Sequence, residues 1–259
     1  MKKTIITTTF TTIILIGILQ TLGYFINQHR LSAGHTGLEA FIPLPSTILT
    51  TFLINWQTLI IELLYTLEKA LGGFIVGTTM GIFIAIFIYF IPSLRHSLMP
   101  FCYGLNSFPI MGFAPAIILI FGQGSAWAII FISALICFFP TLVSVDSSFR
   151  HSNKDLLDVV TILKASKLQK LTKIHIPLAL SNIFLAMRIS IPGSIIGATM
   201  GEWLGSRNGI GQLVTIALYQ LNPGILYAAL TLLTISSLLI TLIIFYIEKK
   251  VLPWKFETN

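Results

Sequence analysis

Four long stretches of this sequence contain no Asp, Glu, Lys or Arg, and they constrain its fold more than any other feature. They are Thr4–His29, Ala70–Leu94, His96–Val145 and Asn208–Ile247, and a fifth stretch, Ile174–Gly201, is interrupted only by Arg188. A helix needs about 20 apolar residues to cross a bilayer. The longest stretch has room for two spans, because a turn-forming sequence at Phe121–Ser125 divides it. The sequence therefore predicts an all-α polytopic membrane protein with six transmembrane helices.

Composition and charge support this class. The chain is 55% hydrophobic and 10% charged, whereas a soluble domain is typically about 25% charged. If the amino terminus is inside the cell, the outer loops keep only Arg30, Lys69 and Arg207 of the basic residues, which is the positive-inside distribution. We expect a multi-pass protein of the bacterial plasma (inner) membrane with both termini in the cytoplasm. The net charge of +7 is then a topology signal and does not indicate a nucleic-acid partner.

The amino-terminal stretch permits two interpretations, a secretory signal cleaved after Gly23 and an uncleaved anchor helix. We expect the anchor, because its apolar run is longer than a usual signal core. Residues 1–40 then form the anchor helix and the start of a periplasmic loop that continues to residue 68, with an amphipathic segment opening at Phe41–Ser46. Residues 41–250 form the core, and residues 251–259 form a cytoplasmic tail.

Glycines recur every four residues in two of the predicted spans. The first set is Gly73, Gly77 and Gly81, and the second is Gly193, Gly197 and Gly201. Residues four apart share a helix face, and small residues on that face let another backbone approach closely. We expect both faces to be helix-packing surfaces.

Helix-breaking residues interrupt the predicted third span, at Pro100, Gly104, Pro109, Gly112 and Pro115. Proline removes a backbone hydrogen bond and bends a helix. In lipid, the freed carbonyls must be satisfied by protein or by a water-lined cavity. Asn106, Ser107 and Pro109 are therefore candidates to line a translocation pathway, and a purely structural kink is the alternative.

Two breaks in the last apolar stretch predict a short helix ahead of the final span. The breaks are Asn208–Gly211 and Asn222–Gly224. The residues between them are too apolar for a plain loop, so we expect a short helix at the outer face.

Glu202 and Arg188 are the charges most deeply placed in the apolar sequence, and ionisable residues in membrane spans are functional candidates by default. Both are candidates for the pathway or a gate. For Glu202, a structural partner such as a backbone amide is an equal alternative. For Arg188, we favour a side chain that extends to the membrane surface.

One long basic segment, Arg150–Pro177, lies between two apolar spans. Its acidic residues near the start and its lysines near the end suit the dipoles of two short helices. The apolar residues between Leu156 and Leu163 are too many for a solvated loop, and an exposed apolar patch usually marks a partner surface. Asp146, just before the segment, is a candidate to pair with one of its lysines.

The spacing within this segment is specific. Asp158-Val159-Val160 is followed after three residues by Lys164, nine residues separate Lys164 from Ile174, and Ile176-Pro177 closes the segment. This resembles the cytoplasmic "EAA" loop of ABC importer permeases, which reads Glu-Ala-Ala, three residues, Gly, nine residues and Ile-x-Leu-Pro. Lys164 stands at the loop glycine, so either it adopts the left-handed geometry that glycine enters freely or the loop turns differently.

Further motifs follow one another as in permeases of the nitrate/sulfonate/taurine importer group, over about Phe41 to Lys250. They include Phe41-x-Pro43-x-Pro45-Ser46, Thr66-Leu67-x-Lys69, Gly72-Gly73-Phe74, Phe121-Gly122, Phe139-Pro140, Glu202-Trp203 and Gly209-Ile210-Gly211. The resemblance implies a type I ABC importer permease core with cytoplasmic coupling helices in the loop 150–177.

The resemblance also implies partners. Two permease copies would form the pathway, two ATPase subunits would dock on the coupling loops, and an extracytoplasmic binding protein would deliver substrate. The coupling contact would comprise Asp158, Val159, Val160, Leu163, Lys164, Ala165, Ser166, Ile174 and Pro177. The chain has no Gly-rich phosphate loop with Lys and Ser/Thr, so we expect ATP and magnesium on the separate ATPase, and no cofactor, metal or catalytic site on this chain.

Two other classes fit less well. An ion-coupled secondary transporter would need buried ionisable groups, of which the spans hold few. A membrane-embedded enzyme would need a nucleophile–base pair or a metal cluster, but the histidines lie in loops or at the ends of spans. The substrate stays open between a small organic or inorganic anion and a pyrimidine-type vitamin precursor.

Overall fold

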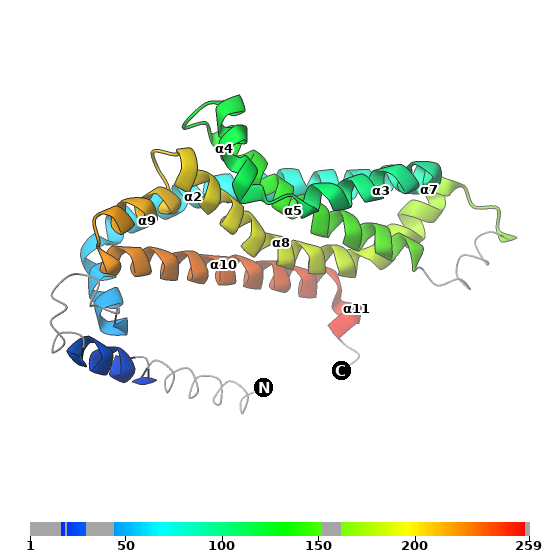
Figure 1. Ribbon diagram of the computed structural model, residues 1–259. Helices are drawn as coiled ribbons and strands as arrows, with labels where there is room; N and C mark the ends of the chain where they lie inside the picture. The colour runs from blue at the N-terminus through cyan, green and yellow to red at the C-terminus, as the bar shows by residue number, and fades with distance from the viewer. Residues whose placement is uncertain (1–16, 19, 30–43, 152–161, 257–259) are drawn as a thin grey trace.

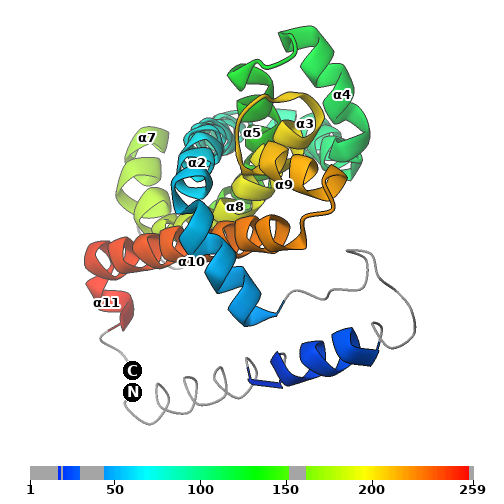
Figure 2. The same cartoon turned by 90° about the vertical axis from the view of Figure 1, so that its left-hand side faces the viewer.

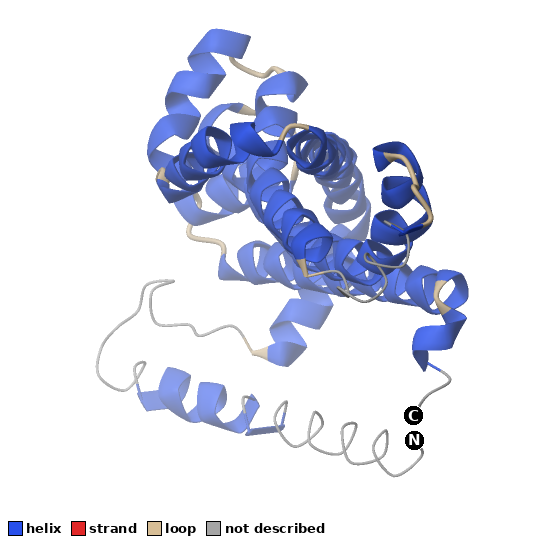
Figure 3. Ribbon diagram, turned by 90° about the vertical axis from the view of Figure 1, so that its right-hand side faces the viewer, coloured by secondary structure: helices blue, strands red, loops and turns tan. Residues whose placement is uncertain are grey.

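The computed structural model describes residues 17–18, 20–29, 44–151 and 162–256, and these residues form helices with no strand among them (Figures 1 and 3). In chain order the elements are α2 (Pro45–Phe90), α3 (Pro92–Ser107), α4 (Ile110–Phe121), α5 (Ala126–Arg150), α7 (Lys167–Lys170), the π-helical turn η2 (Leu171–His175), α8 (Ile176–Gly205), α9 (Ile210–Tyr219), α10 (Pro223–Val251) and α11 (Pro253–Phe256). The predicted all-α membrane fold is confirmed.

Four helical units of the described residues are long and apolar enough to cross a membrane: α2, α5, the continuous run Lys167–Gly205, and α10. The pair α3 and α4 makes a fifth if it counts as one span bent by 96°. The remaining predicted span, Thr4–His29, lies largely outside the described residues. The short helix expected before the last span is present as α9.

The helix α2 starts much earlier than the sequence predicts. Residues 45–68, expected in a periplasmic stretch, belong to a helix of 46 residues whose non-helical backbone is confined to Asn55 (φ −109°, ψ 18°). Pro45 stands in its first turn, where its missing N–H costs no hydrogen bond. From Ser46 to Lys69 the sequence contains no glycine or proline, so nothing in it stops the helix before the membrane span.

The predicted third span breaks at one point. Phe108 has an extended backbone (φ −67°, ψ 131°), as expected for a residue that precedes proline, and Pro109 caps the start of α4. Pro100 and Pro115, which were expected to interrupt the span, both lie inside helices. Of these three prolines, only Pro109 therefore marks a break, and the residue before it has an extended backbone.

The long helices α2, α5, α8 and α10 run along one bundle, and α4 projects away from it (Figure 1). The helix α9 lies at one end, and α7 lies at the other (Figures 1 and 2). We call these the α9 end and the α7 end. The turn between α4 and α5 is tied to the α9 end, because the Gly124 N–H donates to the Gly205 carbonyl at 2.8 Å.

Both glycine faces pack against α5, which lies between α2 and α8. A Cβ at Gly77 would lie 2.9 Å from the Cβ of Cys137, and one at Gly81 would lie 2.8 Å from the Phe138 carbonyl oxygen. From the other side, a Cβ at Gly197 would lie 2.8 Å from the Cα of Ser133. No larger side chain fits at these distances, so the glycines permit the close approach of three helices.

The remaining glycines of the two sets make the same contact. Gly73 faces Ser133, Gly193 faces Ile136, and Gly201 faces Ile129. The Ser133 hydroxyl also donates to the Ser194 carbonyl at 2.8 Å across the α5–α8 seam. Small residues and polar contacts of this kind thus hold α5 at the centre of the bundle.

Candidate functional site

The chain enters α7 through a turn at Ile162–Ser166, inside the predicted coupling segment. Lys164 has φ 54°, so it adopts the left-handed geometry that glycine would take in the family's loop. Ile162 and Leu163 are 80% and 72% exposed. Asp158, Val159 and Val160 lie outside the described residues. The described part of the predicted contact is therefore a surface turn with apolar side chains facing outward.

A capping box fixes the end of this turn. The Ser166 N–H donates to Oε1 of Gln169 at 2.8 Å, and the Gln169 N–H donates to the Ser166 hydroxyl at 3.2 Å. The reciprocal pair satisfies two backbone donors at the start of α7. Ala165 lies between Lys164, which has the left-handed backbone, and Ser166, which caps α7, so both neighbours restrict its backbone.

The remaining coupling candidates lie where the segment joins the bundle. Ile174 is in η2, and Pro177 is in the first turn of α8. Leu171 and His175 of η2 are buried, and the Tyr89 hydroxyl at the end of α2 donates to the Lys167 carbonyl at 3.3 Å. The second expected short helix is thus continuous with the membrane span, and the segment is anchored to α2.

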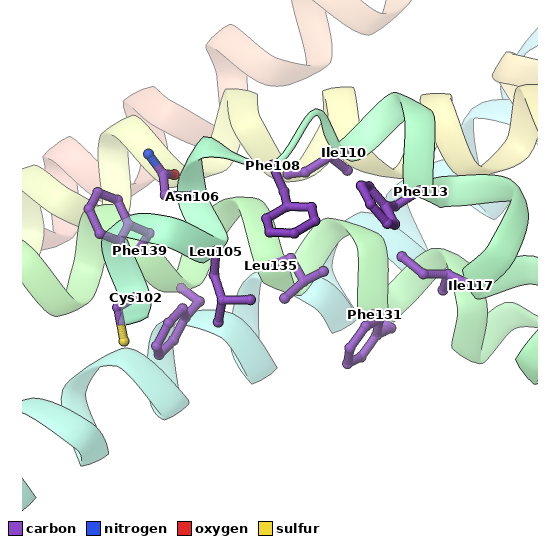
Figure 4. Close-up of a pocket in the computed structure, with 11 residues that line it drawn as sticks. Cys102, Leu105, Asn106, Phe108, Ile110, Phe113, Ile117, Phe131, Leu135 and Phe139 are labelled. Atoms are coloured by element: carbon purple, nitrogen blue, oxygen red, sulfur yellow. The ribbon is translucent and has the colours of Figure 1, made fainter. Parts of the chain in front are cut away.

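A cavity of about 370 Å³ lies between the α3–α4 bend and α5. Figure 4 shows Asn106 at its edge, with Phe108, Phe113, Phe131 and Phe139 around it. Ser107 and Pro109 are not in its lining, and the Ser107 hydroxyl donates to the Tyr103 carbonyl at 3.0 Å. Asn106 is therefore the one of these three that belongs to the cavity lining. A second cavity, of about 610 Å³ between α8 and α10, contains none of the predicted site residues.

Glu202 lies in a closed cluster at the α9 end, completely buried. Its Oε1 accepts from Lys69 Nζ at 3.0 Å, and its Oε2 accepts from the Thr66 hydroxyl at 2.8 Å. The Gly211 N–H also donates to Oε2, at 3.0 Å. This arrangement favours the structural alternative for Glu202, since the carboxylate joins α2 and α9 to the end of α8. We call these residues, with Glu62 and the backbone of residues 208–211, the Glu202 cluster.

The start of α9 is held by α2 as well. The Ile210 N–H donates to the Thr66 hydroxyl at 2.8 Å, and the Gly209 N–H donates to the Glu62 carboxylate. Gly209 has φ 112°, which only glycine adopts readily, and a Cβ there would overlap the Glu202 carboxylate. The free N–H groups at the start of α9 therefore receive anionic or hydroxyl acceptors.

The predicted position of Lys69 was wrong. The sequence placed it in an outer loop, whereas its side chain is only 10% exposed and is paired with Glu202. A buried carboxylate needs a cation or hydrogen-bond donors, and α2 supplies one because it is helical through this region. The motif Thr66-Leu67-x-Lys69 was the available signal, since its two polar residues share a helix face.

Arg188 has a partner that the sequence did not predict. Its side chain is 25% exposed and lies beside Glu248, with Nη2 3.2 Å from Oε2. Lys255 of α11 donates to Oε1 of the same carboxylate at 2.8 Å. The Arg188 guanidinium also lies 5.6 Å from the centre of the Phe245 ring. We call Glu248, Arg188 and Lys255 the Glu248 cluster.

The sequence did not predict the Glu248 cluster, because Glu248 stands beside Lys249 and Lys250 and resembles part of an exposed, charged helix end. The structure buries it completely. The signal was Arg188 itself, since a cation deep in an apolar span requires an anion from a neighbouring helix.

Asp146 pairs with arginines rather than with a lysine of the segment. Arg95 Nη2 lies 3.3 Å from its Oδ2, and Arg150 Nε lies 3.2 Å from the same oxygen. Arg150 is the first residue of the predicted segment, one helical turn after Asp146. The bridge fastens the end of α5 to α3.

Comparison with known proteins decides the class of this fold. The sequence pattern of the family described as "Binding-protein-dependent transport system inner membrane component" matches residues 77–254. This chain belongs to that family. It is a transmembrane permease subunit of an ABC importer, as the motif spacing predicted.

Relatives cover most of the permease. It is 25% identical to the formylaminopyrimidine transport permease protein of Halalkalibacterium halodurans, over 87% of this chain and 90% of the relative. It is 29% identical to the riboflavin transport system permease protein of Chloroflexus aurantiacus, over 85% and 83%. A putative aliphatic sulfonates transport permease protein of Bacillus subtilis is 28% identical over 83% and 78%. The described residues and these relatives give no support to the secondary-transporter alternative.

Proposed function

We propose that the permease couples to a separate ATPase subunit through the turn Ile162–Ser166 and the elements that follow it. The observation that carries the proposal is the exposed apolar pair Ile162 and Leu163, which precedes the capping box of α7. An exposed apolar surface of this kind is suited to a partner. ATP and magnesium are bound by the ATPase, and this chain contributes neither a cofactor site nor a catalytic residue.

Two permease copies form the pathway in this proposal, and an extracytoplasmic binding protein delivers the substrate. Both termini and the α7 end face the cytoplasm, so α9 faces the binding protein. ATP hydrolysis drives alternating access between these two sides. The lysines that follow the turn support this orientation, because basic residues gather on the cytoplasmic side of membrane proteins.

The experiment is co-purification of the permease with the ABC ATPases of the same genome. Ala165→Glu places a charge between Lys164 and the capping box, and we expect it to abolish retention of the ATPase. Gln123→Glu is the matched control, since it adds the same charge to an exposed turn at the α9 end. If the natural chain retains no ABC ATPase, or if Ala165→Glu retains it as well as Gln123→Glu, the proposal is wrong.

We further propose that the substrate is a small planar heterocycle. Two of the relatives above are named for formylaminopyrimidine and riboflavin transport. The lining of the cavity at the α3–α4 bend includes five phenylalanines, and their rings suit a flat ring system. A hydrated anion would find no basic side chain in that lining.

Transport into proteoliposomes that contain the permease, its ATPase and its binding protein tests the substrate. We expect uptake of a labelled pyrimidine and little uptake of labelled nitrate. Phe131→Ala in the cavity should reduce pyrimidine uptake, whereas Phe87→Ala, an exposed residue of α2 outside the cavity, should leave it unchanged. Nitrate uptake with no pyrimidine uptake would contradict the proposal.

A further inference from the structure

Lys164 holds a backbone conformation that its side chain disfavours. Among the described residues other than glycine, only Lys164 and Leu221 have a positive φ. Left-handed geometry costs a non-glycine residue about 1–2 kcal/mol. Glycine would take this geometry without strain, so the turn itself gives no reason for a lysine. Such residues persist where something else compensates for the strain, often at functional sites.

Nothing in the described part of the permease supplies that compensation. The Lys164 side chain is exposed, and no described residue forms an ion pair or hydrogen bond with it. From Ile162 to Gly201 the sequence contains no Asp or Glu. The ammonium group is therefore presented outward, beside the exposed apolar side chains of Ile162 and Leu163.

The backbone that carries this ammonium group is held on its carboxyl-terminal side. Ser166 and Gln169 close the capping box two residues later, and the Tyr89 hydroxyl binds the Lys167 carbonyl. A left-handed residue next to such an anchor directs its side chain differently from a residue in helical or extended geometry. The strained turn thus carries a positive charge directly beside the two exposed apolar side chains Ile162 and Leu163.

We propose that Lys164 pairs with a carboxylate on the ATPase subunit, at the rim of an apolar groove that receives Ile162 and Leu163. This inference rests on the coupling role proposed above and names the chemistry of its partner. The charge at the position of the family's glycine makes the contact selective, because it attracts an acidic rim and disfavours a basic one.

An anionic membrane surface would also attract lysines, but it explains the structure less well. A lipid headgroup layer attracts charge wherever the backbone presents it, so it does not require a lysine in left-handed geometry. It also gives no reason for two apolar residues beside the lysine to be held on a rigid turn. A partner with a positioned carboxylate accounts for both features.

The test measures the affinity of the ATPase for the permease in neutral-lipid nanodiscs, with four single variants. Lys164→Gln removes the charge and keeps a side chain, Lys164→Gly removes both the charge and the strain, and Lys164→Arg keeps the charge. Lys173→Gln is the control, since Lys173 is an exposed lysine of η2 on the same segment.

We expect Lys164→Gln and Lys164→Gly to weaken binding about tenfold at low salt, as the loss of one interfacial charge pair would, and Lys164→Arg and Lys173→Gln to stay within about twofold. High salt should weaken the natural complex toward the level of Lys164→Gln, because it screens the pair. Lys164→Gly binding as tightly as the natural chain, or more tightly, would overturn the inference.

Three further outcomes separate this inference from its alternatives. If Lys164→Gln differs from the natural chain only when phosphatidylglycerol is added to the nanodiscs, the lysine contacts lipid and the inference is wrong. If the natural chain binds no ATPase at all, the coupling role fails first. If every Lys164 variant binds the ATPase with the affinity of the natural chain, the charge contact is refuted and the coupling role stands.

Discussion

The Glu202 cluster and the Glu248 cluster each bury one carboxylate completely, yet they hold it in different ways. Glu202 accepts from a lysine, a hydroxyl and a backbone N–H, all from buried surroundings. Glu248 is held by Arg188, whose side chain is 25% exposed, and by Lys255, whose side chain is 39% exposed. Among the described residues, Arg188 Nε and Glu248 Oε2 form no hydrogen bond, although Arg188 Nη2 lies 3.2 Å from that oxygen as an ion pair.

The difference between the two clusters indicates that the α9 end of the bundle is the more rigid one. At the α9 end, backbone and side-chain donors surround one carboxylate, and Gly209 and Gly211 bring α9 against it. At the α7 end, two long cationic side chains that are partly exposed reach one carboxylate. A fully satisfied buried network fixes one arrangement, whereas exposed cations can turn to water when the helices move. The two clusters can therefore be compared by removing each carboxylate charge in turn.

Glu202→Gln should have the largest effect. It removes the negative charge and leaves the Lys69 ammonium group buried without an anion, which destabilises the fold by about 3 kcal/mol. Unfolding of the purified permease in mixed micelles titrated with SDS measures this loss. Glu68→Gln, an exposed glutamate of α2 near the same end, is the matched control. Adding Lys69→Met should restore part of the stability, because the unpaired cation is then gone. Equal stability of Glu202→Gln and Glu68→Gln would remove the distinction between the clusters.

Glu248→Gln should cost less, about 1–2 kcal/mol. Both of its cations are partly exposed, so they regain water when the carboxylate charge is lost. The same SDS titration measures the difference from Glu202→Gln. A loss as large as that of Glu202→Gln would show that the Glu248 cluster is as rigid as its counterpart.

Lys255→Ala should have the smallest effect, about 0.5 kcal/mol, as for an exposed ion pair. Lys250→Ala is the control, since Lys250 is an exposed lysine close by on α10. High salt should reduce the stability difference between these two variants, because it screens exposed charges. A cost well above that of Lys250→Ala at every salt concentration would assign α11 a firm structural role.

Much of the fold could be predicted because lipid imposes a simple length rule. Apolar stretches gave the spans now seen as α5, α8 and α10, and the turn at Phe121–Ser125 separates α4 from α5 as expected. The start of α2 could not be predicted in the same way. Residues 45–68 are polar enough for a loop, and only their lack of helix breakers marks them as helical.

Of the candidate site, the local features could be predicted and the contacts between distant helices could not. The motif spacing identified Lys164 as the residue at the turn, because the position of a left-handed residue is a local property of the loop. A backbone amide was one alternative for Glu202, and the Gly211 N–H is one. The side-chain partners of Glu202 and Arg188 were missed, because they depend on which helices become neighbours. Lys69 lies 133 residues from Glu202 in sequence, and no local pattern connects the two.

The length of α2 has a mechanical consequence. Between Thr66, which binds Glu202, and Tyr89, which binds the Lys167 carbonyl, α2 is regular helix over roughly 35 Å at 1.5 Å per residue. Asn55, its irregular residue, lies outside this interval. A helix resists compression along its axis, so the distance between these two attachment points is constant. A displacement of the segment at Lys167 is therefore transmitted along α2 to Thr66. Either the start of α9 moves with α2, or the hydrogen bond at Thr66 or at Tyr89 breaks.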